Sequence, residues 1–161
     1  MKSNMAELIT AEEVIAIAFT DGQYIDAGVI ARCDIDAAIE RWVVPVVGKA
    51  LLEAVAEGKY EELKERYLKP VIALYTRLQV QPRLNVSTSQ AGLSVVTTSS
   101  RKAADEAACR ELQRSLKSRA KFLRQRLEEY LDEHKAELAE YNERQNILKR
   151  CRCDGGFVQI H

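Results

Sequence analysis

The chain has 161 residues, 24 basic and 24 acidic side chains, and a formal net charge of zero. This length predicts one domain with a core of its own, and the balanced charge disfavours a dedicated nucleic-acid binder. No apolar run reaches the length of a membrane span, and residues 1–7 are polar, so we expect neither a membrane segment nor a signal peptide. The residue pattern predicts a flexible N-terminus, a helical core, an arm, a long helix and a tail at residues 1–8, 9–80, 81–101, 102–145 and 146–161.

A short helix is predicted over residues 11–19, because Thr10 and Glu13 have the spacing of a capping box. Residues 23–33 allow two interpretations. Either Asp26 caps a helix that runs onward, or Asp34 caps a new helix from Ile35. We favour helix through most of this segment, with a bend near its end.

Two apolar stripes with helical spacing fill residues 35–78, and the polar break Glu57-Gly58-Lys59 joins them. A short break between amphipathic helices makes the helices antiparallel neighbours. Neither helix can cover its stripe alone, so the pair forms the centre of a helical core. The predicted core residues are Ile39, Trp42, Val46, Leu63, Tyr67, Val71 and Leu74.

Each stripe contains a proline, Pro45 in the first and Pro70 in the second. A proline removes one helical hydrogen bond and pushes against the preceding turn. Because helical phase continues past both prolines, we predict kinks; alternatively, Pro45 begins a second helix at its first turn. Gly48 either absorbs the bend or admits another backbone closely.

The helical period changes to alternation after residue 80 and predicts a β-hairpin around the turn Gln90-Ala91-Gly92. An isolated hairpin is marginal in water. The segment is therefore either a flexible polar loop or an arm that becomes ordered against a neighbouring subunit. As an arm, it would offer the apolar residues Leu84, Val86, Leu93 and Val95 as candidate subunit contacts.

A narrow apolar stripe predicts a helix from residue 103 to about residue 143, which would span roughly 60 Å if unbroken. Asp132-Glu133-His134 is its weak point. Basic residues crowd the first half and acidic residues the second, opposite to the preference of the helix dipole. Such poles suit head-to-tail contact between copies, although charge runs are also typical of solvated faces. The candidate contacts are Arg119, Arg124, Glu129 and Glu133.

Motifs of catalysis are not apparent, since the sequence has neither a phosphate-binding glycine loop nor a nucleophile elbow. We interpret Cys33 and Cys109 as small apolar residues and His134 as a solvated helical residue. Cys151 and Cys153 would need two more zinc ligands, with only His161 nearby. We therefore expect no catalytic residues, no metal and no cofactor.

Three segments resemble phage head–tail connector proteins. Leu8-Ile9-Thr10-Ala11-Glu12-Glu13-Val14 resembles their opening, and Pro45-x-x-Gly48-x-x-Leu51 resembles their second helix. Tyr60-x-x-Leu63-x-x-x-Tyr67, followed by Pro70, resembles the next helix in prophage members from Bacteroides-like hosts. The resemblance spans about residues 8–80, and beyond that it rests on a similar order of elements.

The resemblance implies a structural virion protein that joins the portal to the tail or stopper as a ring of roughly a dozen subunits. It would reside in the virion, and in the host cytoplasm before assembly, with nonspecific DNA contact in the lumen. The expected fold is all-α, a helical bundle with a kinked helical hairpin, a long C-terminal helix and a small β-hairpin arm. The alternative function is a small DNA-binding or regulatory protein that uses residues 110–126.

Overall fold

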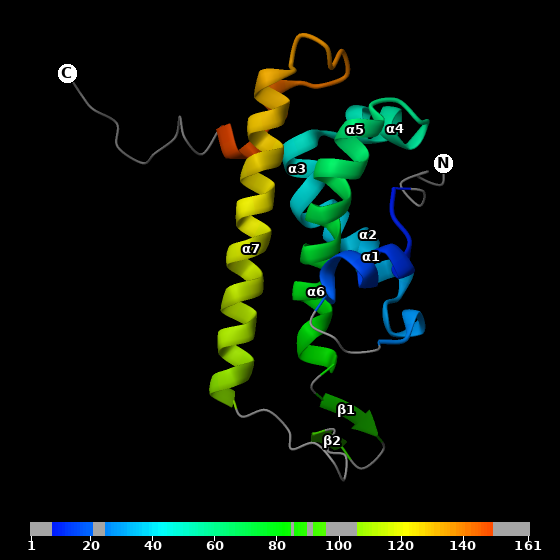
Figure 1. Ribbon diagram of the computed structural model, residues 1–161, viewed down its shortest axis with the longest axis vertical. Coiled ribbons are helices and arrows are strands. Elements are labelled where there is room, and N and C mark those ends of the chain that lie inside the picture. The colour runs from blue at the N-terminus through cyan, green and yellow to red at the C-terminus, as the bar shows by residue number, and fades with distance from the viewer. Residues whose placement is uncertain (1–7, 21–24, 85, 90–91, 96–105, 150–161) are drawn as a thin grey trace, which may run out of the picture.

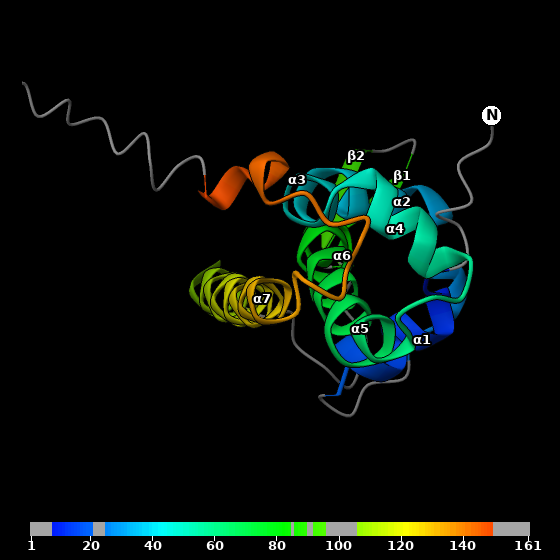
Figure 2. The same cartoon turned by 90° about the horizontal axis from the view of Figure 1, so that it is seen from above.

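The computed structural model describes residues 8–20, 25–84, 86–89, 92–95 and 106–149. The fold is all-α, and α6 lies at its centre. Helices α1 and α2 pack on α6 from one side and α7 packs on it from the other (Figures 1 and 2). The helices are α1 (Ala11–Ala18), α2 (Arg32–Ala38), α3 (Val44–Val47), α4 (Lys49–Ala56), α5 (Glu61–Leu63), α6 (Lys69–Leu84) and α7 (Glu106–Glu133).

The predicted capping box at the start of α1 is confirmed. The Thr10 hydroxyl accepts a hydrogen bond from the Glu13 N–H at 3.2 Å, and the Glu13 carboxylate accepts one from the Thr10 N–H at 2.8 Å. The other Glu13 oxygen pairs with Lys69 Nζ at 2.7 Å. One acidic side chain therefore caps α1 and also ties it to α6.

Residues 25–34 correct the helix expected there. Asp26 caps only the single 3₁₀ turn η2 (Ala27–Val29), through a hydrogen bond from the Gly28 N–H. Helix α2 starts at Arg32, so Asp34 lies in its first turn and does not precede it. The Asp34 carboxylate instead accepts from the Ala31 N–H at 3.0 Å and from the Arg83 guanidinium at 2.7 Å, which joins this segment to the end of α6.

Both helices that contain a proline widen into a π-helical turn just before it. The turn η3 (Ile39–Val43) precedes Pro45, and η4 (Lys64–Leu68) precedes Pro70. The N–H just before each proline bonds to the carbonyl five residues back, from Val44 to Ile39 and from Lys69 to Lys64. A wider turn relieves the clash between the proline ring and the carbonyl four residues back. Pro45 is the second residue of the short helix α3, which follows η3 directly, as the alternative interpretation placed it in a first turn, whereas Pro70 is the second residue of the long helix α6.

Gly48 interrupts the first stripe, which we had predicted to be continuous. Its backbone, at φ 86° and ψ 153°, ends α3 and immediately starts α4. This conformation is essentially reserved for glycine. Gly48 therefore absorbs the bend, as one of the two interpretations expected, but the result is a break between two short helices.

The polar break after α4 is a Schellman turn. The Lys59 N–H bonds to the Ala54 carbonyl, and the Gly58 N–H bonds to the Val55 carbonyl. Gly58 has a φ of +93°, and Tyr60 follows in the left-handed region. This turn reverses the chain, so α5 and α6 run back along the preceding helices as predicted.

The core forms where the two stripes meet, and five of its predicted residues are buried: Ile39, Val46, Leu63, Val71 and Leu74. Trp42 and Tyr67 correct that prediction, because both are half-buried and pack against the rim of the core. Trp42 stacks on Tyr75 with ring centroids 4.8 Å apart, and Tyr67 lies 4.3 Å from Tyr130 of α7. Tyr67 therefore contacts α7 directly, and Trp42 stacks on Tyr75, whose ring lies near Arg124 of α7.

Helix α6 extends to Leu84 and passes through Pro82, so the helical core ends later than residue 80. Leu84 is a half-buried helical residue packed against the core, which corrects its assignment to a strand. Beyond it, β1 (Val86–Ser89) and β2 (Gly92–Val95) pair antiparallel, with Val86 opposite Val95. The predicted turn residues Gln90 and Ala91 lie outside the described residues.

The long helix is shorter than predicted. Helix α7 has 28 residues and a length of about 42 Å, and it ends at the weak point identified in the sequence. From His134 the chain folds back through turns and the 3₁₀ helix η5 (Glu143–Gln145). Leu138 and Tyr141 still pack against the core, although they belong to this returning segment and not to α7.

Candidate assembly surfaces

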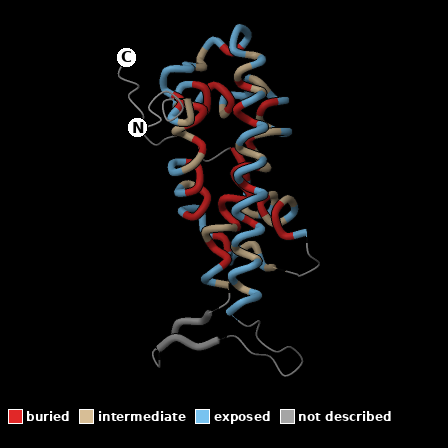
Figure 3. The backbone as a smooth tube through the Cα atoms, turned by 90° about the vertical axis from the view of Figure 1, so that its left-hand side faces the viewer, coloured by how far each residue is buried: buried red, intermediate tan, exposed pale blue. Residues whose placement is uncertain are grey.

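The outward side of α7 is exposed over most of its length (Figure 3). Phe122 stands on this side with 61% of its surface exposed. Lys117 and Lys121 lie one helical turn apart along one edge of this side, and Arg119 lies along the other edge, because residues two apart point to opposite sides of a helix. None of these three basic side chains makes a hydrogen bond or ion pair with any described residue. We call these three residues and Phe122 the basic band. An exposed aromatic ring among unpaired cations is a feature of contact surfaces.

Arg124, also predicted as a subunit contact, points elsewhere. Its guanidinium lies 5.9 Å from the centre of the Tyr75 ring. Tyr75 stacks on Trp42, and the Arg41 guanidinium lies 5.0 Å from the centre of the Trp42 ring. Burial raises the pKa of the Tyr75 hydroxyl. Arg124 therefore belongs to a cluster of two arginines and two aromatic rings from η3, α6 and α7.

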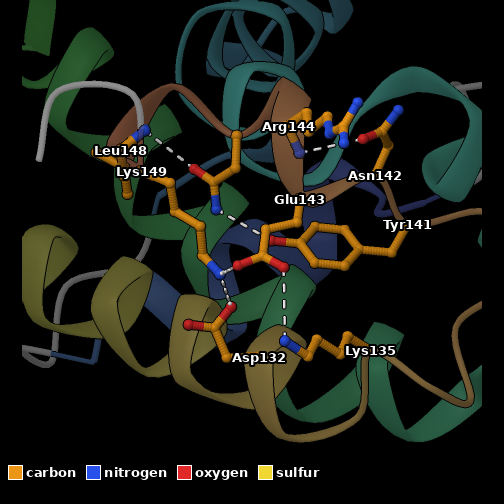
Figure 4. A network of polar contacts seen from close by, with 9 residues as sticks. Asp132, Lys135, Tyr141, Asn142, Glu143, Arg144, Leu148 and Lys149 are labelled. Atoms are coloured by element: carbon orange, nitrogen blue, oxygen red, sulfur yellow. Dashed lines mark hydrogen bonds and ion pairs between the residues drawn. The ribbon is translucent and has the colours of Figure 1, made fainter. Parts of the chain in front are cut away.

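One carboxylate on the acidic half of α7, Asp132, is paired within the chain. Residues 134–149, which we call the C-terminal strap, fold back beside it (Figure 4). Lys149 Nζ reaches Asp132 Oδ1 at 2.6 Å and also pairs with Glu143, and Lys135 pairs with Glu143 at 3.5 Å. The predicted contact residues Glu129 and Glu133 remain exposed, and Glu129 accepts a hydrogen bond from Gln125.

The middle of the strap is attached to the residues just before α5. The Tyr60 hydroxyl donates to Glu140 at 2.7 Å, and Lys59 Nζ lies 2.9 Å from the same carboxylate. These contacts hold the pKa of Glu140 at about 2. Burial opposes the charge of Lys149, but hydrogen bonds to Asp132 and Glu143 outweigh it and raise the Lys149 pKa. The strap is therefore held by charged contacts in addition to the packing of Leu138, Tyr141 and Leu148 against the core.

Asn146 and Leu138 are the buried parts of the strap. The Asn146 side chain donates to the Tyr141 hydroxyl at 3.1 Å and accepts from the Leu148 N–H at 3.0 Å, so its polar atoms are satisfied despite burial. Glu128 on α7 differs, because it is 6% exposed and one of its carboxylate oxygens has no hydrogen-bond partner in the described part of the chain.

A second set of unpaired charges surrounds the Schellman turn. Glu53, Glu57 and Glu61 are exposed, and within the described residues their carboxylates make neither a hydrogen bond nor an ion pair. We call these three residues the acidic turn. It lies across the molecule from α7 in both ribbon views (Figures 1 and 2). The chain therefore carries unpaired charges of opposite sign on two different sides.

Several sequence interpretations about reactive residues need adjustment. Cys33 is exposed and is not a small core residue, whereas Cys109 is half-buried. His134 is half-buried just beyond α7, and its ring stacks on Tyr130 at 4.1 Å, so it is not a solvated helical residue. Cys151, Cys153 and His161 lie outside the described residues. Across the described ranges, no group of three or more metal-ligating side chains comes together.

The strands place three other predicted contacts by backbone register alone. Val86 pairs with Val95, and Leu93 pairs with Thr88.

In the part of the chain that the structure describes, no helix is both long and apolar enough to cross a membrane.

Residues 43–150 match the Family of unknown function (DUF6712). The chain belongs to this family. The DUF6712 match begins within η3 and covers the Gly48 break, the acidic turn, α6, α7 and the strap. It leaves out α1 and the segment Leu8-Ile9-Thr10-Ala11-Glu12-Glu13-Val14. No curated protein matches the chain, and no solved structure matches it.

The strap and the acidic turn were not predicted as surfaces from the sequence. Leu138 and Tyr141 of the strap continue the apolar spacing of α7. This spacing correctly predicted that they pack against the core, but it wrongly predicted that they lie on the same helix. Glu53, Glu57 and Glu61 are spaced four apart on either side of Gly58. This spacing could have predicted an acidic surface, since it places the three side chains in or beside one chain reversal.

Proposed function

We propose that this DUF6712 chain is a structural virion protein, a ring-forming head–tail connector subunit between the portal and the tail or stopper. The observation that carries the proposal is the way in which the segment Pro45-x-x-Gly48-x-x-Leu51 folds. The sequence of this segment resembles the second helix of connectors. Its proline follows a π turn, its glycine has a φ that favours glycine, and its leucine is buried. The residues of the resemblance are thus the ones that shape the centre of the fold.

The surface supports an assembly role. The basic band, which includes the exposed Phe122, and the acidic turn lie on the outside of a chain whose net charge is zero. In the proposal, β1 and β2 act as an arm that contacts a neighbouring subunit. The role is structural and not catalytic, and the protein would reside in the virion after a period in the host cytoplasm.

Purified protein, alone and mixed with the portal protein from the same genome, tests this proposal by light scattering at low and high salt. We expect a closed assembly of many copies, or binding to the portal as a ring. A chain that stays a single copy under both salt conditions and never binds the portal would refute the proposal.

The alternative is nonspecific DNA binding by residues 110–126, which the unpaired cations of the basic band favour. Its test is the affinity for random duplex DNA at several salt concentrations. A steep loss of affinity with rising salt, in protein that does not assemble, would support the alternative over the connector.

A further inference from the structure

We propose that the basic band of one copy binds the acidic turn of the next copy. This inference rests on the proposed assembly function and names the two surfaces that meet. The basic band consists of Phe122 with Lys117 and Lys121 on one side of it along the helix surface and Arg119 on the other. The acidic turn consists of Glu53, Glu57 and Glu61.

Charge complementarity identifies a second copy of this chain as the partner. All six charged side chains are exposed, and none forms an ion pair within the described residues. Each copy is neutral overall, so copies do not repel one another at long range, while the two surfaces attract.

The acidic half of α7 is a weaker partner for the basic band. On that half, Lys149 holds Asp132, Glu128 is buried, and Glu129 accepts a hydrogen bond from Gln125. Glu133 is the one carboxylate of that half that is exposed without a hydrogen bond or ion pair within the described residues, whereas the acidic turn offers three. The acidic turn can therefore form more pairs with a neighbour without breaking a contact inside the chain.

The placement of the two surfaces determines the type of contact. The basic band and the acidic turn lie on different sides of the molecule (Figures 1 and 2). Each copy therefore offers one surface to the neighbour before it and the other to the neighbour after it. Such a heterologous contact repeats and closes into a ring when the rotation between copies allows it.

Phe122 gives the contact an apolar centre. A ring that is 61% exposed loses its water when a neighbour covers it, and the surrounding ion pairs then lie in a drier environment. Exposed ion pairs alone are weak. Phe122→Ser should therefore weaken assembly at least tenfold while leaving the melting temperature unchanged.

Charge reversal in solution tests the pairing. The band variant carries Arg119→Glu and Lys121→Glu, and the turn variant carries Glu53→Lys and Glu57→Lys. Wild-type protein at low salt should form assemblies that dissociate toward 1 M salt, where charges are screened beyond about 3 Å. Each variant alone should remain a single copy. A chain with all four substitutions, which restores complementarity and zero net charge, should assemble again.

A matched control separates this contact from pairing between two α7 helices. Glu129→Lys with Glu133→Lys changes the net charge as much as the turn variant does, but on the acidic half of α7. It should assemble as wild type does. Unchanged far-ultraviolet circular dichroism would show that every variant folds, as expected from the exposure of all these positions.

Each outcome decides the question. If the turn variant assembles normally or the fourfold variant stays a single copy, the proposed contact is wrong, while a wild-type ring would still support the connector function. If wild-type protein never self-associates at low salt, the contact is also wrong, and binding to the portal then decides the function separately.

Discussion

Replacing Gly48 should destabilise the fold through the backbone conformation of this residue. Its φ of 86° and ψ of 153° cost a residue with a side chain about 1–3 kcal/mol. A Cβ at this position would meet its nearest atom, Gln145 Oε1, at 3.5 Å, which is ordinary contact and adds no penalty. Alanine also reduces the freedom of the unfolded chain, which offsets about 0.4–1 kcal/mol.

Gly48→Ala should therefore lower the free energy of unfolding by about 1–2 kcal/mol. The melting temperature should fall by roughly 2–8 °C for a chain of this length. Gly48→Asn should cost as much, because asparagine tolerates the left-handed helical region but not this extended one. Gly28→Ala is the control, since its φ is ordinary. Its Cβ would meet Asp26 Oδ1 at 3.2 Å, which an exposed side chain can relieve by a small shift, so this variant should lose less stability than Gly48→Ala. A Gly48→Ala protein that melts with the wild type would refute the backbone argument.

Three further predictions concern Trp42, the strap and a buried arginine. Trp42→Ala should cost roughly 2–3 kcal/mol in chemical unfolding, less than a fully buried tryptophan, and Trp42→Phe should recover part of the loss by stacking on Tyr75. The folded-state pKa of Glu140 is about 2 against an ordinary 4.5, so its stabilisation of the strap is complete above about pH 4.5 and is lost as pH falls toward 2. Hydrogen exchange of residues 134–149, corrected for intrinsic rates, should rise across this window, and it should rise less in Glu140→Gln; an equal rise in both would contradict the assignment. Arg77→Lys should lose about 1–3 kcal/mol, because lysine cannot keep both the bond to the Ala18 carbonyl and the contact with the Phe19 ring; an unchanged unfolding midpoint would contradict this role.

Local signals predicted local structure well. The capping box at Thr10 and Glu13 formed as its spacing required, because both hydrogen bonds close within one turn of chain. The end of α7 near residue 133 also followed from nearby sequence. Most residues of the apolar stripes are buried, since helical period reports which side of a helix faces the core.

Features that depend on distant residues were not predictable in this way. Arg77 lies on an apolar helix and is buried, and its guanidinium binds the Ala18 carbonyl, 59 residues earlier, at 2.5 Å. Nothing in its neighbouring residues identifies that partner. Likewise, two prolines signalled kinks, but the π turns that accommodate them became visible only in the backbone hydrogen bonds.

Zero net charge gave an incomplete view of the surface, because assembly depends on where the charges lie. The strap neutralises Asp132, Glu140 and Glu143 with lysines and a tyrosine of the same chain. Among the described residues, neither the basic band nor the carboxylates of the acidic turn form ion pairs, and Lys59, the base within that turn, is paired with Glu140. The strap thus determines which acidic groups stay available to a neighbour. Weakening it should therefore shift contacts between copies from the acidic turn toward α7 itself.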